Sequence, residues 1–141
     1  MPNERHFGLV SQLEVAFHHE THIAEFTGFQ DAAEERTFYM LLDRRATHLL
    51  WYRLTSALFP EEAPTLTAVA GTAPLQAVDG HPVITSIRLR HENNLFFITG
   101  ETFNGTWHLH LGGADAERVW ASLDVLLHPL GWQGRESSAN D

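Results

Sequence analysis

The pattern His108-Leu109-His110 places two metal-binding side chains two residues apart, in a segment that alternates polar and apolar residues. On a β-strand, residues i and i+2 project from the same face, so both imidazoles could reach one ion. A third ligand would come from Glu101, on the neighbouring strand, or from His22 in a histidine-rich stretch near the N-terminus. The pattern predicts a zinc site, whose open position would supply hydroxide for metal-dependent hydrolysis. The competing interpretation is that the histidines are the polar face of a half-exposed strand.

A second group of residues indicates binding rather than catalysis. If the segment 31–59 is helical, one stripe of that helix carries four side chains: Arg36, Met40, Arg44 and Trp51. Arginine, methionine and tryptophan are enriched at protein–protein interfaces, where lysine and acidic residues are depleted. The stripe therefore predicts an interface with a protein partner or with a second copy of the chain. The alternative is a solvated helix face.

Three aromatic residues in the same strand-rich region suggest a third possibility. A curved sheet that packs around a long helix can enclose an apolar pocket for a small ligand. Phe96, Phe97 and Trp107 are the side chains expected to line such a pocket.

The composition limits the classes of protein and partner. The chain has 141 residues, a net charge of −9 and no cysteine, so disulfides and thiolate metal sites are excluded. All nine basic residues are arginines, and those between 36 and 53 are matched by acidic residues, so we expect no nucleic-acid binding. No apolar run is long enough to span a membrane, and the first residues lack the apolar stretch of a signal peptide. We therefore expect a cytoplasmic protein.

The length suits one domain, which we place at 1–133, and the small polar residues 134–141 predict a disordered tail. The segment 81–112 shows strand-like alternation, interrupted by turn signals at Asn93-Asn94 and Asn104-Gly105. This predicts an antiparallel meander. Helical spacing of apolar residues predicts a C-terminal helix over 114–130.

The remaining segments are ambiguous. Leucine, alanine and arginine dominate 31–59, which favours one long helix, but a hairpin of strands 37–42 and 47–54 also fits. The N-terminal segment favours a hairpin over 9–28, with a helix over 4–18 as the alternative. Small and β-branched residues predict one strand within 65–78.

These elements predict an α+β domain of two layers, with a curved antiparallel sheet, a long central helix and a C-terminal helix. The leading functional hypothesis is a non-enzymatic module that self-associates or binds a protein partner. The alternatives are a metal-binding protein or metal-dependent hydrolase using His108 and His110, and a binder of small apolar ligands.

Overall fold

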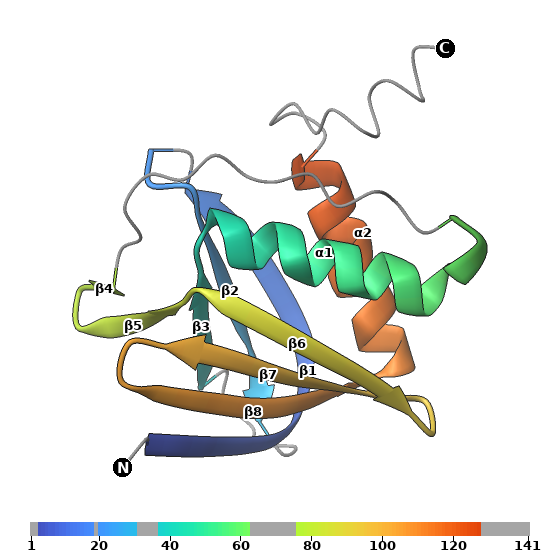
Figure 1. Cartoon of the computed structure of the whole chain (residues 1–141), viewed down its shortest axis with the longest axis horizontal. Coiled ribbons are helices and arrows are strands. Elements are labelled where there is room, and N and C mark those ends of the chain that lie inside the picture. The colour runs from blue at the N-terminus through green and yellow to red at the C-terminus, as the bar shows by residue number, and fades with distance from the viewer. Residues whose placement is uncertain (1–2, 19, 31–36, 63–75, 128–141) are drawn as a thin grey trace.

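The computed structural model describes residues 3–18, 20–30, 37–62 and 76–127, which form one curved mixed sheet and two helices (Figure 1). The strands are β1 (Asn3–His18), β2 (Ile23–Gln30), β3 (Phe38–Leu42), β4 (Ala77–Val78), β5 (His81–Ile84), β6 (Ser86–Glu92), β7 (Leu95–Thr102) and β8 (Gly105–Gly112). The helices are α1 (Arg44–Leu58) and α2 (Gly113–Leu127), with a 3-10 turn η1 (Pro60–Glu62) after α1. The strand order is β4-β5-β3-β2-β1-β8-β7-β6.

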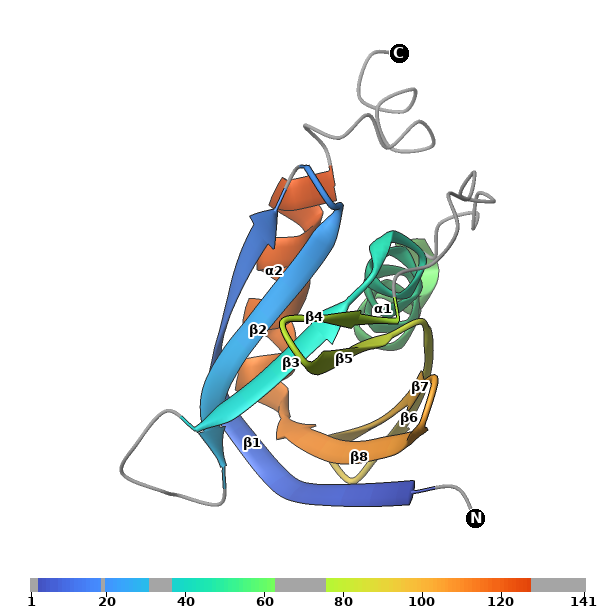
Figure 2. The same ribbon diagram turned by 90° about the vertical axis from the view of Figure 1, so that its left-hand side faces the viewer.

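The long strand β1 belongs to two halves of the sheet. Its first part pairs in parallel with β8, and its second part, from Val10 onward, pairs antiparallel with β2. The register shifts once in each part, between His6 and Gly8 and between Ser11 and Glu14, and Gly8 and Gln12 have left-handed φ values of 71° and 53°. Such bulges bend a strand and increase its twist. Figure 2 shows β1 turning the corner between the two halves.

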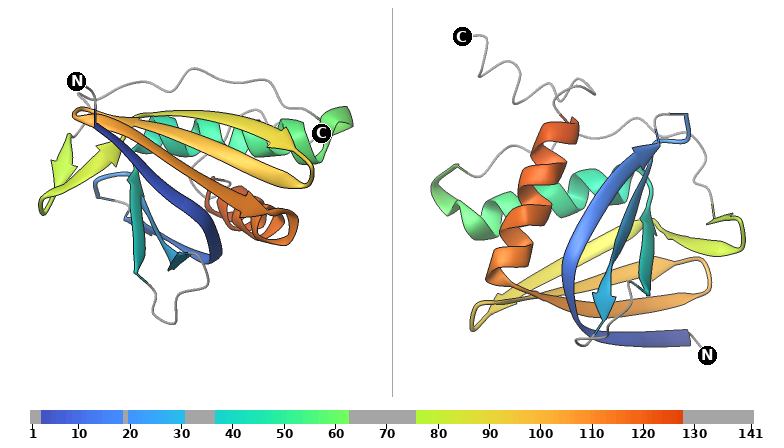
Figure 3. Two further views of the ribbon diagram at one scale, coloured as in Figure 1. Left: turned by 90° about the horizontal axis from the view of Figure 1, so that it is seen from below. Right: turned by 180° about the vertical axis from the view of Figure 1, so that it is seen from behind.

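Both helices pack on the same face of this bent sheet, and the hydrophobic core lies between them and the strands (Figure 3). Alternate residues of β8, namely Trp107, Leu109 and Leu111, are buried in this core. The residues between them, including His108 and His110, therefore lie on the opposite face. We call the helix-free side of β6, β7, β8 and the first part of β1 the outer face.

The α+β class and several elements are confirmed. Strands β6, β7 and β8 form the predicted antiparallel meander, and α2 matches the predicted C-terminal helix. The first turn uses Asn93 and Asn94 at φ values of 52° and 61°, the left-handed conformation that asparagine tolerates. The N-terminal hairpin is β1 and β2, so the alternative helix over 4–18 is wrong.

The sheet differs from the expected one in its pairing. It is mixed rather than antiparallel, because β1 pairs in parallel with β8 and β3 pairs in parallel with β5. Residues 81–84 accordingly form a separate strand beside β3 instead of the start of the meander. Within the segment 65–78, the part that the structure describes contains only the short strand β4.

The segment 31–59 is neither one long helix nor a hairpin. Phe38–Leu42 is a strand between β2 and β5, and α1 begins only at Arg44. Asp43 separates them, because its Oδ1 accepts a 2.8 Å hydrogen bond from the amide of Ala46 and caps the helix. Residues 31–36 and the predicted tail at 134–141 lie outside the described residues.

Candidate functional site

The outer face carries a set of polar and aromatic side chains arranged in rows across the strands. The register aligns Arg88 of β6 with Thr99 of β7, His108 of β8 and His6 of β1. One row further along, Arg90, Phe97 and His110 are aligned in the same way. Neighbouring strands lie about 4.8 Å apart, so side chains within a row touch or nearly touch.

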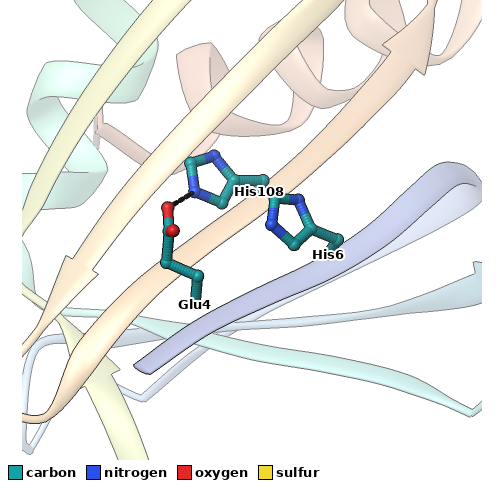
Figure 4. Close-up of side chains that lie close together, drawn as sticks. All are labelled: Glu4, His6 and His108. Carbon is teal, nitrogen blue, oxygen red and sulfur yellow. Dashed lines mark hydrogen bonds and ion pairs between the residues drawn. The ribbon is translucent and has the colours of Figure 1, made fainter. Parts of the chain in front are cut away.

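Glu4, His6 and His108 form the tightest cluster of potential metal ligands on this face (Figure 4). One ligand atom from each residue lies within 4.8 Å of the other two. Nε2 of His108 is 2.9 Å from Oε1 of Glu4, and the rings of His6 and His108 stack with centroids 4.6 Å apart. Two imidazoles and a carboxylate are a donor set that suits zinc and other first-row divalent metals. We refer to these three residues as the Glu4–His6–His108 cluster.

A groove of about 580 Å³ runs along the same face beside the cluster. Its charged and aromatic lining residues are His6, Arg88, Arg90, Phe97, His108 and His110, and we call it the outer groove. The guanidinium of Arg90 lies 4.6 Å from the centre of the Phe97 ring, and the His110 ring lies 5.3 Å from it on the neighbouring strand. The groove therefore combines cationic groups with an aromatic surface, a combination that recognises anionic and aromatic groups.

The predicted metal ligands are brought together only in part. His108 and His110 do project from one face, but His110 packs on Phe97 and is not in the cluster. Glu101 instead lies 3.9 Å from the guanidinium of Arg88, while His22 lies in the turn after β1 against Phe17. The other two members of the cluster, Glu4 and His6, come from β1, a strand that the sequence analysis did not consider as a source of ligands.

The predicted interface stripe does not form a surface. Met40 belongs to β3 rather than to the helix, and it is 1% exposed, while Trp51 is fully buried. Arg44 is half-buried at the start of α1, and Arg36 lies outside the described residues. The prediction fails because it applied one helical period to a segment that contains a strand, a cap and a helix.

The predicted apolar pocket is also divided by the sheet. Phe96 and Trp107 are buried in the core on the helix side, whereas the neighbouring Phe97 lines the outer groove. Successive residues of a strand point to opposite faces, so Phe96 and Phe97 cannot line one pocket.

Two ionisable groups elsewhere have strongly shifted pKa values. The pKa of His48 on α1 is lowered to about 4, mainly by burial and to a smaller extent by the nearby charge of Arg44. Burial also raises the pKa of Tyr39 to about 12, assisted by its 2.6 Å hydrogen bond to Glu25. That bond is in turn the main reason why the pKa of Glu25 is lowered. The Tyr39–Glu25 pair lines a second cavity, of about 500 Å³, beside β2 and β3.

Comparisons with protein-family models, with curated proteins and with solved structures give no match for this chain. The function must therefore be argued from the residues themselves. Neither described helix is long and apolar enough to cross a bilayer.

Proposed function

We propose that the protein is a non-enzymatic binding module that takes an acidic segment of a protein partner into the outer groove. The observation that supports this most directly is the charge of the groove. Two arginines and three histidines line it, whereas the carboxylates that contact them, Glu4, Glu92 and Glu101, are not among its lining residues in the described part of the chain. This concentration of basic groups is unusual in a chain with a net charge of −9.

The two arginines are available to a partner. Their nearest carboxylates are Glu101, 3.9 Å from Arg88, and Glu92, 3.1 Å from Arg90. The arginine side chains are 70% and 65% exposed, and ion pairs exposed to this degree contribute little to stability. A partner carboxylate can therefore replace either glutamate and bind the guanidinium in a bidentate manner.

The aromatic part of the groove adds specificity to this attraction. Phe97 lies between Arg90 and His110, so an apolar side chain of the partner would pack on its ring. The supported ligand is thus an extended segment in which acidic and apolar residues alternate. Self-association of the chain itself is the competing outcome, because its excess of acidic residues could supply such a segment.

Fluorescence anisotropy with a labelled peptide of alternating glutamate and leucine tests the proposal. We expect binding at low salt that weakens as salt is raised, because the attraction is between charges. The double variant Arg88→Ala/Arg90→Ala should weaken binding about tenfold or more, corresponding to ~1.4 kcal/mol. Arg53→Ala removes an exposed arginine of α1 instead and should leave binding unchanged.

Sedimentation velocity over a range of protein concentrations separates the two occupants. A concentration-dependent mass that the double variant abolishes would assign the groove to a second copy and overturn the proposed partner. Peptide binding that is equally strong in wild type, double variant and control would show that the groove is not the binding surface.

Zinc binding is the second candidate function, and the Glu4–His6–His108 cluster is the observation that favours it. Equilibrium dialysis of the untagged protein against zinc, followed by metal analysis, tests this. We expect one bound ion per chain in wild type and in His110→Ala, and none in His108→Ala. Zinc retained by His108→Ala would exclude this site.

A further inference from the structure

We propose that a divalent metal ion bound by the Glu4–His6–His108 cluster fastens the first part of β1 to β8 and so controls how often this part of the strand detaches. The inference rests on the second candidate function, zinc binding. It adds a mechanical consequence: the cluster joins the first strand to the last one, and its members Glu4 and His108 are separated by 104 positions in the chain.

The cluster is close to the geometry that an ion requires. Ligand atoms bound to one tetrahedral zinc at about 2.1 Å lie about 3.4 Å from one another. Here the three atoms lie within 4.8 Å of one another, one pair is joined by a 2.9 Å hydrogen bond, and the two imidazole rings are stacked with 8° between their planes. The side chain of Glu4 is 56% exposed and that of His108 is 31% exposed, so both can rotate until the hydrogen-bonded pair opens, the rings tilt and the three atoms converge on an ion. The fourth position would face solvent.

The first part of β1 is the segment that such an ion would hold. Among the described residues its backbone pairs with β8 alone, because pairing with β2 begins only at Val10. A strand with one neighbour detaches more easily than one held on both sides. The bulge at Gly8 marks the point about which this part of the strand can move independently.

Two side chains already hold the segment on the helix side of the sheet. Phe7 is 8% exposed and packs in the core against the rings of Phe38 and Trp107. The guanidinium of Arg5 lies 5.0 Å from the centre of the Trp107 ring. The metal would add a link on the outer face, so that the segment is held from both sides. Detachment would then expose Trp107 and the edge of β8.

The size of the effect follows from mass action. An ion that binds only the attached strand lowers the detached population by the factor 1 + [metal]/Kd. At a free zinc concentration one hundred times Kd, the detached population should therefore fall about one hundredfold. The effect should be confined to the first part of β1 and to its partner β8.

Hydrogen–deuterium exchange of the untagged full chain, with and without zinc, tests this. The Kd is first measured by isothermal titration calorimetry. With saturating zinc, we expect exchange to slow up to about one hundredfold at the amides of residues 3–9 and 105–110 that pair β1 with β8, and to stay unchanged in β2 and β3. Glu4→Gln, which keeps the shape of the side chain, and His108→Ala should lose both zinc binding and the slowing. His110→Ala, on the same strand and face, should keep both.

The outcomes separate the two hypotheses. If wild type binds no zinc, or if Glu4→Gln and His108→Ala bind it as well as wild type, the metal site itself is wrong. If wild type binds zinc through these residues but exchange in 3–9 does not change, the site remains and the fastening of β1 is overturned. Circular dichroism of each variant without zinc shows whether it has folded, and a folded Glu4→Gln suffices if His108→Ala does not fold.

Discussion

The indole nitrogen of Trp51 donates a 3.0 Å hydrogen bond to Oδ1 of Asp124 and thereby joins α1 to α2. A second indole makes the reciprocal connection, since Nε1 of Trp120 donates to Oγ1 of Thr55 at 2.8 Å. Each helix thus contributes one tryptophan donor and one acceptor. A buried indole needs such an acceptor, which explains how Trp51 can be fully buried in the core.

The first prediction concerns this helix–helix connection. Asp124→Ala should lower the free energy of unfolding by about 1–3 kcal/mol, because it removes the acceptor of the Trp51 indole. Urea denaturation followed by circular dichroism measures the change. Glu117→Ala removes an exposed carboxylate from the same helix and should alter stability by less than about 0.5 kcal/mol. Equal effects of the two substitutions would show that the bond contributes nothing specific.

The sequence predicts best those elements whose signals are local. The meander strands alternate with period two, and the first turn between them uses Asn93 and Asn94 in left-handed conformations. The second turn lies where Asn104-Gly105 predicts it, but neither of these residues has a positive φ. The strand Phe38–Leu42 carries no such signal. Four of its five side chains are buried, three in the main core and Leu41 in a second apolar cluster with Ile23 and Val83, so the strand does not alternate and resembles a piece of buried helix.

The candidate site illustrates the other limit of sequence reasoning. His108 and the shared face of His108 and His110 follow from the spacing of two residues. Glu4 and His6 show the same spacing, but nothing local indicates that β1 lies beside β8. A parallel pairing between the two ends of a chain is a property of the whole fold, and only the structure brings these residues together.

The second prediction is a loss of stability in mild acid caused by His48. Its pKa is about 4 in the folded protein, mainly because of burial, and about 6.5 in an unfolded chain. Between these values the unfolded chain binds a proton that the folded protein does not, so stability decreases as pH falls from about 6.5 towards 4. By pH 5 the loss should reach about 2 kcal/mol.

Urea denaturation at pH 7.5 and pH 5 measures this effect in wild type and in His48→Leu. The difference in stability between the two pH values should be smaller by ~2 kcal/mol in the variant, which cannot be protonated at this position. His91→Leu, which replaces an exposed histidine, should retain the wild-type difference. An unchanged difference in His48→Leu would mean that His48 accepts a proton in the folded protein as readily as in the unfolded chain.

The third prediction concerns the hydrogen bond from Tyr39 to Glu25. Tyr39→Phe should raise the pKa of Glu25 towards its ordinary value, because the hydroxyl is the main group that stabilises the carboxylate. Carbon-13 NMR titration of the Glu25 carboxyl group measures this directly. His18→Ala should raise this pKa less, since the imidazole is more distant, at 3.4 Å.

The sign of the accompanying stability change follows from the direction of the Glu25 shift. A carboxyl group whose pKa is lowered in the folded protein stabilises the fold at pH values above the ordinary pKa of glutamate. This stabilisation is lost as the pH falls through the pKa of the folded protein. As the pH falls through that range, the free energy of unfolding of Tyr39→Phe should therefore decrease less than that of wild type. A Glu25 titration that is the same with and without the hydroxyl would contradict the assigned cause.

The fourth prediction tests the close approach of β1 and β2 at the bend. A Cβ atom added to Gly28 would lie 2.8 Å from Cδ2 of Leu13 and 2.9 Å from the backbone oxygen of Ser11. The leucine side chain can rotate away, but the Ser11 oxygen belongs to the strand beside the bulge and cannot move alone. Gly28→Ala should therefore lower the free energy of unfolding by about 1–3 kcal/mol, measured by urea denaturation.

Gly112 provides the matched control, because it ends β8 and a Cβ atom added there would have no neighbour within 4 Å. Gly112→Ala should be neutral or stabilise the protein by up to about 1 kcal/mol, since alanine reduces the conformational freedom of the unfolded chain. Equal stability of the two variants would mean that β1 and β2 can move apart at Gly28 without a cost in folding free energy.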